Sequence, residues 1–380
     1  RVLRTGLLAS AVRPRAEALM DALHAGVASG VGRGGGERLT ERELEGLLVG
    51  GARWAVERGL GEAEDLRVLE DAGTFPGADP GLVSSRAMER GRDQLGTLGS
   101  GNHFLELQAV DELYDEAAAR AFGLFKGQFV VMVHTGSRGL GYQVCTDALK
   151  LMPVAMKKAG ISLPDRQLAC APLGSPEGKD YLAAMAAAAN FARANRQAVT
   201  HKVRAACRDA LGLSASELGM SVLYDVSHNL AKYERHTVDG VLRRLCVHRK
   251  GATRAFPAGH EDVPEVYRSV GQPVLVPGTM GTASYVLVGT PRAMTETFGS
   301  VCHGAGRVMS RTEAARRVRP DELRRRLKDM GITARTDSWR EFAEEAPEAY
   351  KDVAEVVEVC ESAGLSRKVA RLKPFGVLKG

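Results

Sequence analysis

Four of the nine histidines stand beside glycine or polar residues, close to expected strands. They are His103, His134, His228 and His303. Loops at strand ends are free to vary, and functional sites of α/β proteins gather there. Neutral imidazole is the commonest metal ligand in proteins, so three or four such side chains can converge on one Mn²⁺, Zn²⁺ or Fe²⁺ ion. For any one histidine alone, a hydrogen bond to a nearby carbonyl is the simpler interpretation.

Two other segments have residue types that suit phosphate groups. Residues 248–254 (His-Arg-Lys-Gly-Ala-Thr-Arg) form a basic cluster. Residues 277–284 (Pro-Gly-Thr-Met-Gly-Thr-Ala-Ser) follow an expected strand, and their amides and hydroxyls can hold an anion or a base edge. An ordinary glycine turn explains the second segment equally well.

Several familiar motifs of nucleotide and acyl chemistry are missing from the sequence. It has no P-loop, no G-x-S-x-G nucleophile elbow and no Lys-x-Asp-Gly ligase signature, and its glycine clusters do not fit a dinucleotide-binding loop. If the protein transfers nucleotides, a residue other than that lysine must carry them. Histidine is chemically able to do so.

Composition favours a soluble globular protein. Hydrophobic residues make up 44% of the 380 residues and charged residues 26%, with a net charge of +6 that is compatible with nucleic-acid partners. No run of about 18 apolar residues predicts a membrane helix, and the first residues do not resemble a signal peptide. The six cysteines are scattered without a CxxC pair, which favours a reducing, cytoplasmic location.

Short apolar segments punctuated by glycine predict a buried sheet. The expected strands are 104–108, 129–134, 221–226, 244–249, 272–276 and 284–289. Helices are expected after the capping-box pair Thr40 and Glu43, over 180–212, near 311–328, and over 347–363 with Tyr350 on its apolar stripe. Residues 30–36 and 72–100 are expected to be loops, and 373–380 show no periodicity.

The motifs, taken together, closely resemble the RNA-splicing ligase RtcB family. They occur in family order from residue 98 to residue 380: LGSGNHFLE (98–106), HTGSRG (134–139), SHN (227–229), HRKGATR (248–254), PGTMG (277–281), CHGAGR (302–307) and GVLKG (376–380). The resemblance implies one mixed α/β catalytic domain over residues 1–380, with packed sheets surrounded by helices. Residues 147–215 are expected to form a helical insertion at its periphery.

The resemblance implies a GTP- and Mn²⁺-dependent RNA ligase of tRNA splicing or RNA repair. The family joins RNA ends bearing a 2′,3′-cyclic phosphate or 3′-phosphate to ends bearing a 5′-hydroxyl. His303 matches the histidine that attacks the α-phosphate of GTP and carries GMP. Broken RNA or tRNA exon halves would be the partners, with an accessory activating protein as a further possibility.

Roles for other residues follow from the same motif matches. His103, His134 and His228 match Mn²⁺ ligands; Phe104 would pack on guanine and Glu106 would accept hydrogen bonds from its edge. The implied nucleotide-binding set is Asn102, His103, Phe104, Leu105, Glu106, His228, Asn229, Pro277, Gly278, Thr279, Met280, Ser284, His303, Gly304, Ala305, Gly306, Tyr350 and Lys379. The implied RNA or phosphate contacts are Arg138, Arg249, Lys250, Arg254 and Arg307.

The resemblance also places an Asp and a Cys that bind Mn²⁺ immediately before the stretch that matches residues 1–5. The chain has no initiator Met, and we expect the natural protein to extend upstream. Two alternatives remain open. A metal-dependent phosphoesterase on RNA ends would use His103, His134 and His228 without His303, and an RNA-binding repair accessory would need none of the four.

Overall fold

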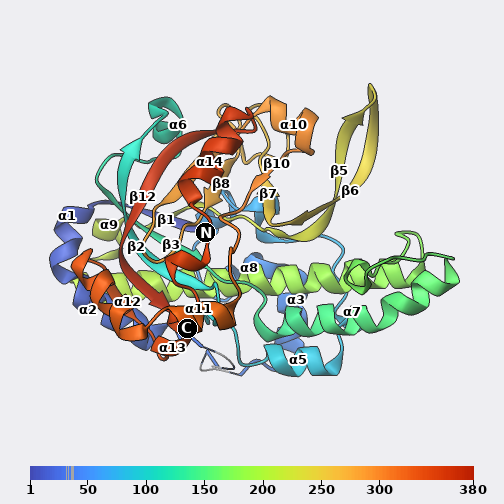
Figure 1. Cartoon of the computed structure of the whole chain (residues 1–380), viewed down its shortest axis with the longest axis horizontal. Helices are drawn as coiled ribbons and strands as arrows, with labels where there is room; N and C mark the ends of the chain where they lie inside the picture. Colours follow the sequence, from blue (N-terminus) through green and yellow to red (C-terminus); the bar gives the residue numbers. More distant parts are fainter. Residues whose placement is uncertain (31, 33, 36–37) are drawn as a thin grey trace.

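The computed structural model describes residues 1–30, 32, 34–35 and 38–380. One large sheet forms the centre of the molecule, and all neighbours along its main path are antiparallel. Its order is β4 (Ser221–Tyr224), β1 (Val2–Leu8), β3 (Gln128–His134), β2 (Phe104–Leu113), β12 (Ser366–Lys379), β9 (Ser284–Gly289) and β8 (Pro273–Val276), while β11 (Thr333–Arg335) pairs in parallel with β12. Helices surround this sheet (Figure 1), which confirms the expected mixed α/β class.

Two short ribbons accompany the large sheet. β5 (Asn229–Val238) pairs with β6 (Val241–Lys250), and β7 (Ala252–Arg254) pairs with β10 (Ser300–Cys302). All six expected strands are present, although the one expected at 244–249 is only the second part of β6. β1, β5 and the three-residue strands β7, β10 and β11 were not expected. β5 in particular carries few apolar residues and therefore lacks the usual strand signal.

The absence of periodicity at 373–380 was misleading, because this segment is the end of the central strand β12. β12 packs apolar residues into several clusters. Phe375 and Leu378 belong to one core cluster, Leu372 to a second and Val377 to a third. A strand buried on both faces has no polar side to alternate with, so a period of two is not expected.

The longest helix is α8 (Pro176–Leu211), which lies beside α7 (Arg138–Lys158). Both helices project together from the body at one end (Figure 1). The expected helix over 180–212 is therefore present, but a purely peripheral position is wrong: Phe191, Ala194 and Val199 of α8 belong to the buried core. The division of the chain at residues 147 and 215 stays a prediction.

The other helical expectations are met in part. α3 (Glu41–Glu57) begins with the predicted capping box at Thr40. The helix expected near 311–328 is two helices, α11 (Arg311–Arg317) and α12 (Pro320–Asp329), because a proline disfavours helical backbone at the residue before it. The helix expected over 347–363 is a 3₁₀ turn at Pro347–Ala349 followed by α14 (Val353–Ser362), so Tyr350 lies between them.

Shorter helices complete the shell. They are α1 (Ala9–Val12), α2 (Ala16–Gly26), α4 (Ala63–Leu66), α5 (Ser85–Gly91), α6 (Glu116–Ala121), α9 (Ala215–Leu218), α10 (Pro291–Thr297) and α13 (Trp339–Ala343). α5 lies in the segment expected to be an extended loop, and the loop expected at 30–36 falls partly outside the described residues. Among the described helices, none has the length and apolar character needed to cross a membrane.

Candidate active site

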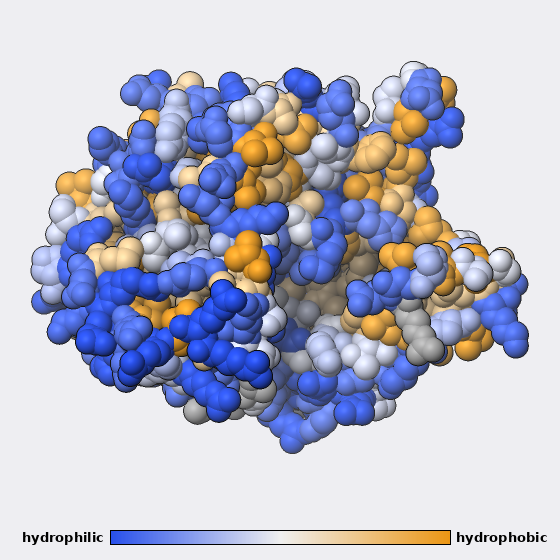
Figure 2. Space-filling model, viewed as in Figure 1, coloured by the Kyte–Doolittle hydropathy of each residue, from blue (hydrophilic) through white to orange (hydrophobic). Residues whose placement is uncertain are grey.

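A cavity of about 590 Å³ opens between the large sheet, the α7–α8 pair and the β5–β6 ribbon. Figure 2 shows that the molecular surface is hollowed where the α7–α8 pair and the β5–β6 ribbon leave the body. The helices contribute an apolar wall that includes Val144, Tyr181 and Met185. The opposite wall is basic and polar, and all four histidines expected to do chemistry line the cavity.

Different strand ends bring the four histidines together. His103 directly precedes β2, His134 ends β3, His228 lies between β4 and β5, and His303 follows β10. The Nε2 atoms of His134 and His228 are 3.2 Å apart. The ring centroids of His228 and His303 are 4.6 Å apart, and those of His103 and His134 are 5.9 Å apart.

These imidazoles are held in the neutral form. Burial lowers the pKa of His103 to about 3, helped by the nearby cation of Arg138. Burial also lowers the pKa of His228 to about 3, places the pKa of His134 well below its usual range, and lowers that of His303. In all four rings the Nδ1 atom is buried without a hydrogen-bond partner. Buried polar atoms are normally satisfied, so this cluster has unused capacity to bind.

The donor set fits a divalent metal ion in its chemistry. No group of three or more His, Cys, Asp and Glu side chains in the described part of the chain has a complete metal-site arrangement. However, two imidazole nitrogens that each lie about 2.1 Å from one ion are separated by roughly 3.0–3.4 Å. The His134–His228 separation of 3.2 Å falls in this range. His103 is the nearest further imidazole on the His134 side.

A second, smaller cavity of about 60 Å³ adjoins the first. Its lining gathers most of the residues expected to bind a nucleotide: Asn102, Phe104, Glu106, Pro277, Gly278, Thr279, Met280, His303, Gly304, Ala305, Tyr350 and Lys379. Asn102, His134, Pro277 and His303 line both cavities. A group bound in the small cavity therefore lies within reach of the histidine cluster.

Glu106 is the buried carboxyl group of the small cavity. Its side chain points from β2, is 1% exposed, and accepts a 2.6 Å hydrogen bond from Gln108 Nε2. Burial raises the pKa of Glu106 to about 8. Lys379 enters the same cavity from β12, with Nζ 5.7 Å from the centre of the Phe104 ring, and burial lowers its pKa to about 8.

Some residues of the expected nucleotide set do not present a side chain to either cavity. Leu105 points to the opposite face of β2 and is fully buried in the core. The Ser284 hydroxyl accepts hydrogen bonds from Gln108 Nε2 and the Gly278 amide. It therefore positions Gly278, which lines the small cavity, without lining the cavity itself. Gly306 is not among the lining residues, whereas His228 and Asn229 line the large cavity only.

Glu345 lines the small cavity and was not expected from the sequence. Its buried carboxylate accepts hydrogen bonds from Arg307 Nη1 at 2.8 Å, from Arg311 Nε at 2.8 Å and from the Tyr350 hydroxyl. The guanidinium of Arg307 also binds the Tyr350 hydroxyl and the Glu344 carbonyl. Arg307 thus holds Tyr350 and Glu345 in place at the pocket rim. No local motif marks Glu345; only the fold brings it to this place.

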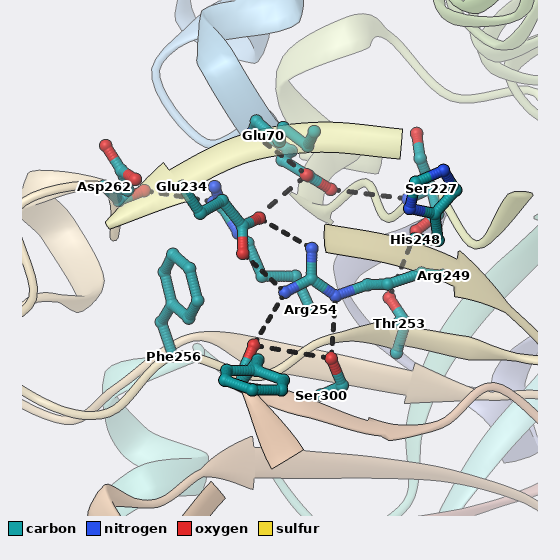
Figure 3. Close-up of polar contacts among 12 residues, drawn as sticks. Glu70, Ser227, Glu234, His248, Arg249, Thr253, Arg254, Phe256, Asp262 and Ser300 are labelled. Carbon is teal, nitrogen blue, oxygen red and sulfur yellow. Dashed lines mark hydrogen bonds and ion pairs between the residues drawn. The ribbon is translucent and has the colours of Figure 1, made fainter. Parts of the chain in front are cut away.

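Three arginines expected at RNA are committed to buried carboxylates instead: Arg307 to Glu345, as described above, and Arg249 and Arg254 to acidic partners around the β5–β7 region. Arg249 donates to both oxygens of Glu234, at 2.6 and 2.8 Å, and to Ser300 Oγ (Figure 3). Arg254 is 1% exposed; its Nε donates to Gln272 and lies 3.8 Å from Glu70. Both side chains therefore serve the fold of the β5–β7 region. Their basic sequence context gave no sign of the distant acidic partners.

Arg138 and Lys250 remain available at the large cavity. Arg138 Nε donates to Thr97 Oγ1 at 2.9 Å, and burial lowers its pKa to about 10, so it stays charged. Lys250 is exposed at the end of β6. Together they give the histidine cavity two cations without a carboxylate among its described lining residues.

Fold and site together define a mixed α/β enzyme in which a neutral histidine cluster adjoins a small pocket with a buried carboxyl group and a buried lysine. The family model described as "tRNA-splicing ligase RtcB" matches residues 1–380. The chain is 56% identical over 380 residues to the tRNA-splicing ligase RtcB of Archaeoglobus fulgidus, covering all of this chain and 79% of that protein. It is 54% identical over 376 residues to the RNA-splicing ligase RtcB of Mycobacterium bovis, covering 99% and 85%.

A third relative, the tRNA-splicing ligase RtcB of Pyrococcus abyssi, is 55% identical over 380 residues, and the chain spans 42% of its length. The chain belongs to the RtcB family, and with it to the enzyme class of RNA ligases.

Proposed function

We propose that this protein is a GTP- and Mn²⁺-dependent RNA ligase. It joins RNA ends bearing a 2′,3′-cyclic phosphate or 3′-phosphate to ends bearing a 5′-hydroxyl, in tRNA splicing or RNA repair in the cytoplasm. The names of its relatives support the RNA substrate. The observation that carries the proposal is the position of His303, which lines both cavities and lies beside His228.

His103, His134 and His228 are the residues that would hold Mn²⁺. Their buried, neutral rings support this role. When bound, the metal ion polarises the α-phosphate of GTP and offsets the charge of the departing pyrophosphate. Asn102 and Asn229 line the same cavity, which supports their assignment to the phosphates.

The small cavity would hold guanine. Phe104 would pack against the base. Glu106, whose pKa burial raises to about 8, would lose its proton on binding and accept hydrogen bonds from the N1 and amino edge. Adenine presents no such donor pair and would leave a buried carboxylate unpaired, so GTP is selected over ATP. Lys379, Tyr350, and the backbone of Gly304 and Ala305 complete the pocket.

The transfer begins at His303. Its lowered pKa keeps a nitrogen lone pair free at neutral pH. That nitrogen attacks the α-phosphorus of GTP, a phosphorus–nitrogen bond forms, and pyrophosphate leaves. A Cβ at Gly304 would lie 3.2 Å from the Pro277 carbonyl oxygen, so the backbone packs closely against Pro277 where both residues line the small cavity.

RNA enters the reaction after the nucleotide. A cyclic end is first hydrolysed to a 3′-phosphate, whose oxygen then attacks the GMP phosphorus and displaces His303. The 5′-hydroxyl of the other RNA attacks the activated 3′-phosphate, a phosphodiester forms and GMP leaves. Arg138 and Lys250 line the large cavity as cations, which supports their assignment to the phosphates. The proposal includes an accessory protein as a partner.

The test is the intact mass of the protein after incubation with GTP and Mn²⁺. The proposal expects a gain of one GMP that is lost in acid, as a phosphoramidate should be. No gain while Mn²⁺ is bound contradicts it. RNA 3′-phosphatase or cyclic-phosphate hydrolysis without the adduct would then favour a phosphoesterase, and RNA binding without any turnover would favour an accessory protein.

A further inference from the structure

The β5–β6 ribbon begins at the histidine cavity and extends away from it. Asn229 and Lys250 form its first residue pair and line the large cavity, as does His248 two residues further along β6. The ribbon then projects from the body and ends at its turn in solvent (Figure 1). A two-stranded ribbon is marginal alone, so its position depends on how its inner face is held.

One face of the ribbon is anchored to the body. Residues directly opposite in the register point to the same side, and this inner side carries Leu230, Lys232, Glu234 and Arg249. Lys232 pairs with Glu70 and Asp71, and Arg249 joins Glu234 to Ser300 (Figure 3). These buried contacts fix the direction of the ribbon.

The other face is exposed and basic. From the cavity outward it carries the pairs Asn229–Lys250, Ala231–His248, Tyr233–Cys246, Arg235–Arg244 and Thr237–Leu242. Lys250, His248, Arg235 and Arg244 are all exposed, and none of the residues on this described face is acidic. We call these residues the outer face of the ribbon.

Two features of the outer face point to an external anion. Arg235 and Arg244 lie directly opposite each other, and like charges in that position are destabilising. In the part of the chain that the structure describes, neither guanidinium has an ion-pair partner. Tyr233 is 43% exposed, with the Arg244 guanidinium 4.4 Å from its ring centre.

We propose that the outer face of the β5–β6 ribbon binds the single-stranded segment of an RNA substrate and leads its end to His303. The inference rests on the proposed function and adds a substrate-binding surface to it. From the Asn229–Lys250 pair to the Arg235–Arg244 pair the ribbon advances six residues, about 20 Å. This length accommodates several nucleotides, with cations for the phosphates and an aromatic ring for one base.

Single-stranded RNA fits this surface better than a duplex. Proteins that bind single strands combine a basic track with aromatic side chains on which bases stack. In a duplex the bases are already stacked and paired, so Tyr233 would have no base to receive. The cations of the outer face also continue those of the cavity, Arg138 and Lys250. No carboxylate on the outer face interrupts this basic track, along which the phosphates of a single strand can bind.

The test measures the affinity of the protein for a fluorescent single-stranded oligoribonucleotide with a 3′-phosphate, over a range of salt concentrations. Each phosphate contact contributes about 0.7 to the slope of log affinity against log salt for single strands. The double variant Arg235→Ala/Arg244→Ala should therefore bind several-fold more weakly and lower the slope by about 1.4. Tyr233→Ala should weaken binding about fivefold or more with little change in slope.

Arg243→Ala is the matched control, because Arg243 is exposed on the same strand but belongs to the inner face, opposite His236. It should bind RNA as the unsubstituted protein does. Equal losses for Arg243→Ala and the double variant, an unchanged slope in the double variant, or an equal loss for duplex RNA would overturn the proposal. Thermal unfolding of each variant separates loss of binding from loss of fold.

The GMP adduct is measured separately on the unsubstituted protein, in the absence of RNA. Lack of an adduct there counts against the proposed function. The RNA titration then still tests, on its own, whether the outer face of the ribbon binds RNA. An adduct together with unaltered RNA binding in the double variant counts against the ribbon alone.

Discussion

The Nε2 atoms of His134 and His228 face each other at 3.2 Å, although 94 residues separate them in the sequence. Burial keeps both rings neutral, and their Nδ1 atoms have no hydrogen-bond partner. The two nitrogens are at hydrogen-bond distance, with one ring as donor and the other as acceptor, and a cation between the rings would instead bind the lone pairs of both Nε2 atoms. This relationship is the geometric reason for expecting the metal ion here.

Replacing His228 with Ala should weaken Mn²⁺ binding by at least about tenfold, because even residues that only support metal ligands cost 10–100-fold when removed. Calorimetric titration of the protein with Mn²⁺ measures this directly. His201→Ala, an exposed histidine on α8, provides the control. Equal affinity in the two variants would remove His228 from the metal site.

His303→Ala should abolish the covalent GMP adduct while leaving Mn²⁺ binding largely intact, since His303 is assigned to the phosphorus and not to the metal. Intact mass after incubation with GTP and Mn²⁺ gives the result, and His201→Ala again serves for comparison. An adduct that persists at full yield would show that another residue carries the nucleotide.

The buried histidines should also make stability depend on pH. The pKa of His103 is about 3 in the folded chain, whereas an unfolded histidine titrates near 6.5. Between these values the unfolded chain binds more protons, so the free energy of unfolding falls as the pH falls from about 6.5 to 3. The contribution of one such group approaches about 1.4 kcal/mol per pH unit inside this window.

Urea unfolding without metal, at several pH values from 7 to 4.5, measures this dependence. The decline should be shallower in His103→Gln than in the unsubstituted protein and unaltered in His201→Gln. Parallel profiles for His103→Gln and the unsubstituted protein would contradict the burial of a neutral imidazole at this position.

Glu106→Ala should lower the affinity for GTP and reduce its preference over ATP by about tenfold or more, because the only assigned acceptor for the guanine edge is removed. Competition of GTP and ATP for adduct formation measures the ratio. Glu112→Ala, further along the same strand and partly exposed, is the control. A preference for GTP that survives unaltered would place the base elsewhere.

The glycine-flanked histidines could be recognised in the sequence because each motif is local. Glu345 could not: its partner Arg307 lies 38 residues away, and only the folded chain shows that the two side chains meet beside Tyr350. In the same way, β12 escaped recognition because burial on both faces removes the alternation by which a strand is found.

The basic segment 248–254 illustrates the opposite error. Its charges were expected at phosphates, yet alternation along β6 turns Arg249 inward to Glu234 while His248 and Lys250 face the cavity. A run of basic residues in a sequence does not show whether each charge meets a ligand, a carboxylate of the same chain or solvent.

This correction can be tested with Arg249→Ala, which leaves the buried carboxylate of Glu234 without its bidentate partner. Removing one member of a buried ion pair costs about 3–5 kcal/mol, so the free energy of unfolding in urea should fall by an amount of that order. Lys250→Ala, one residue along and exposed, should change it by less than about 0.5 kcal/mol. If Arg249→Ala instead keeps full stability and loses RNA affinity, Arg249 contacts RNA and its structural assignment is wrong.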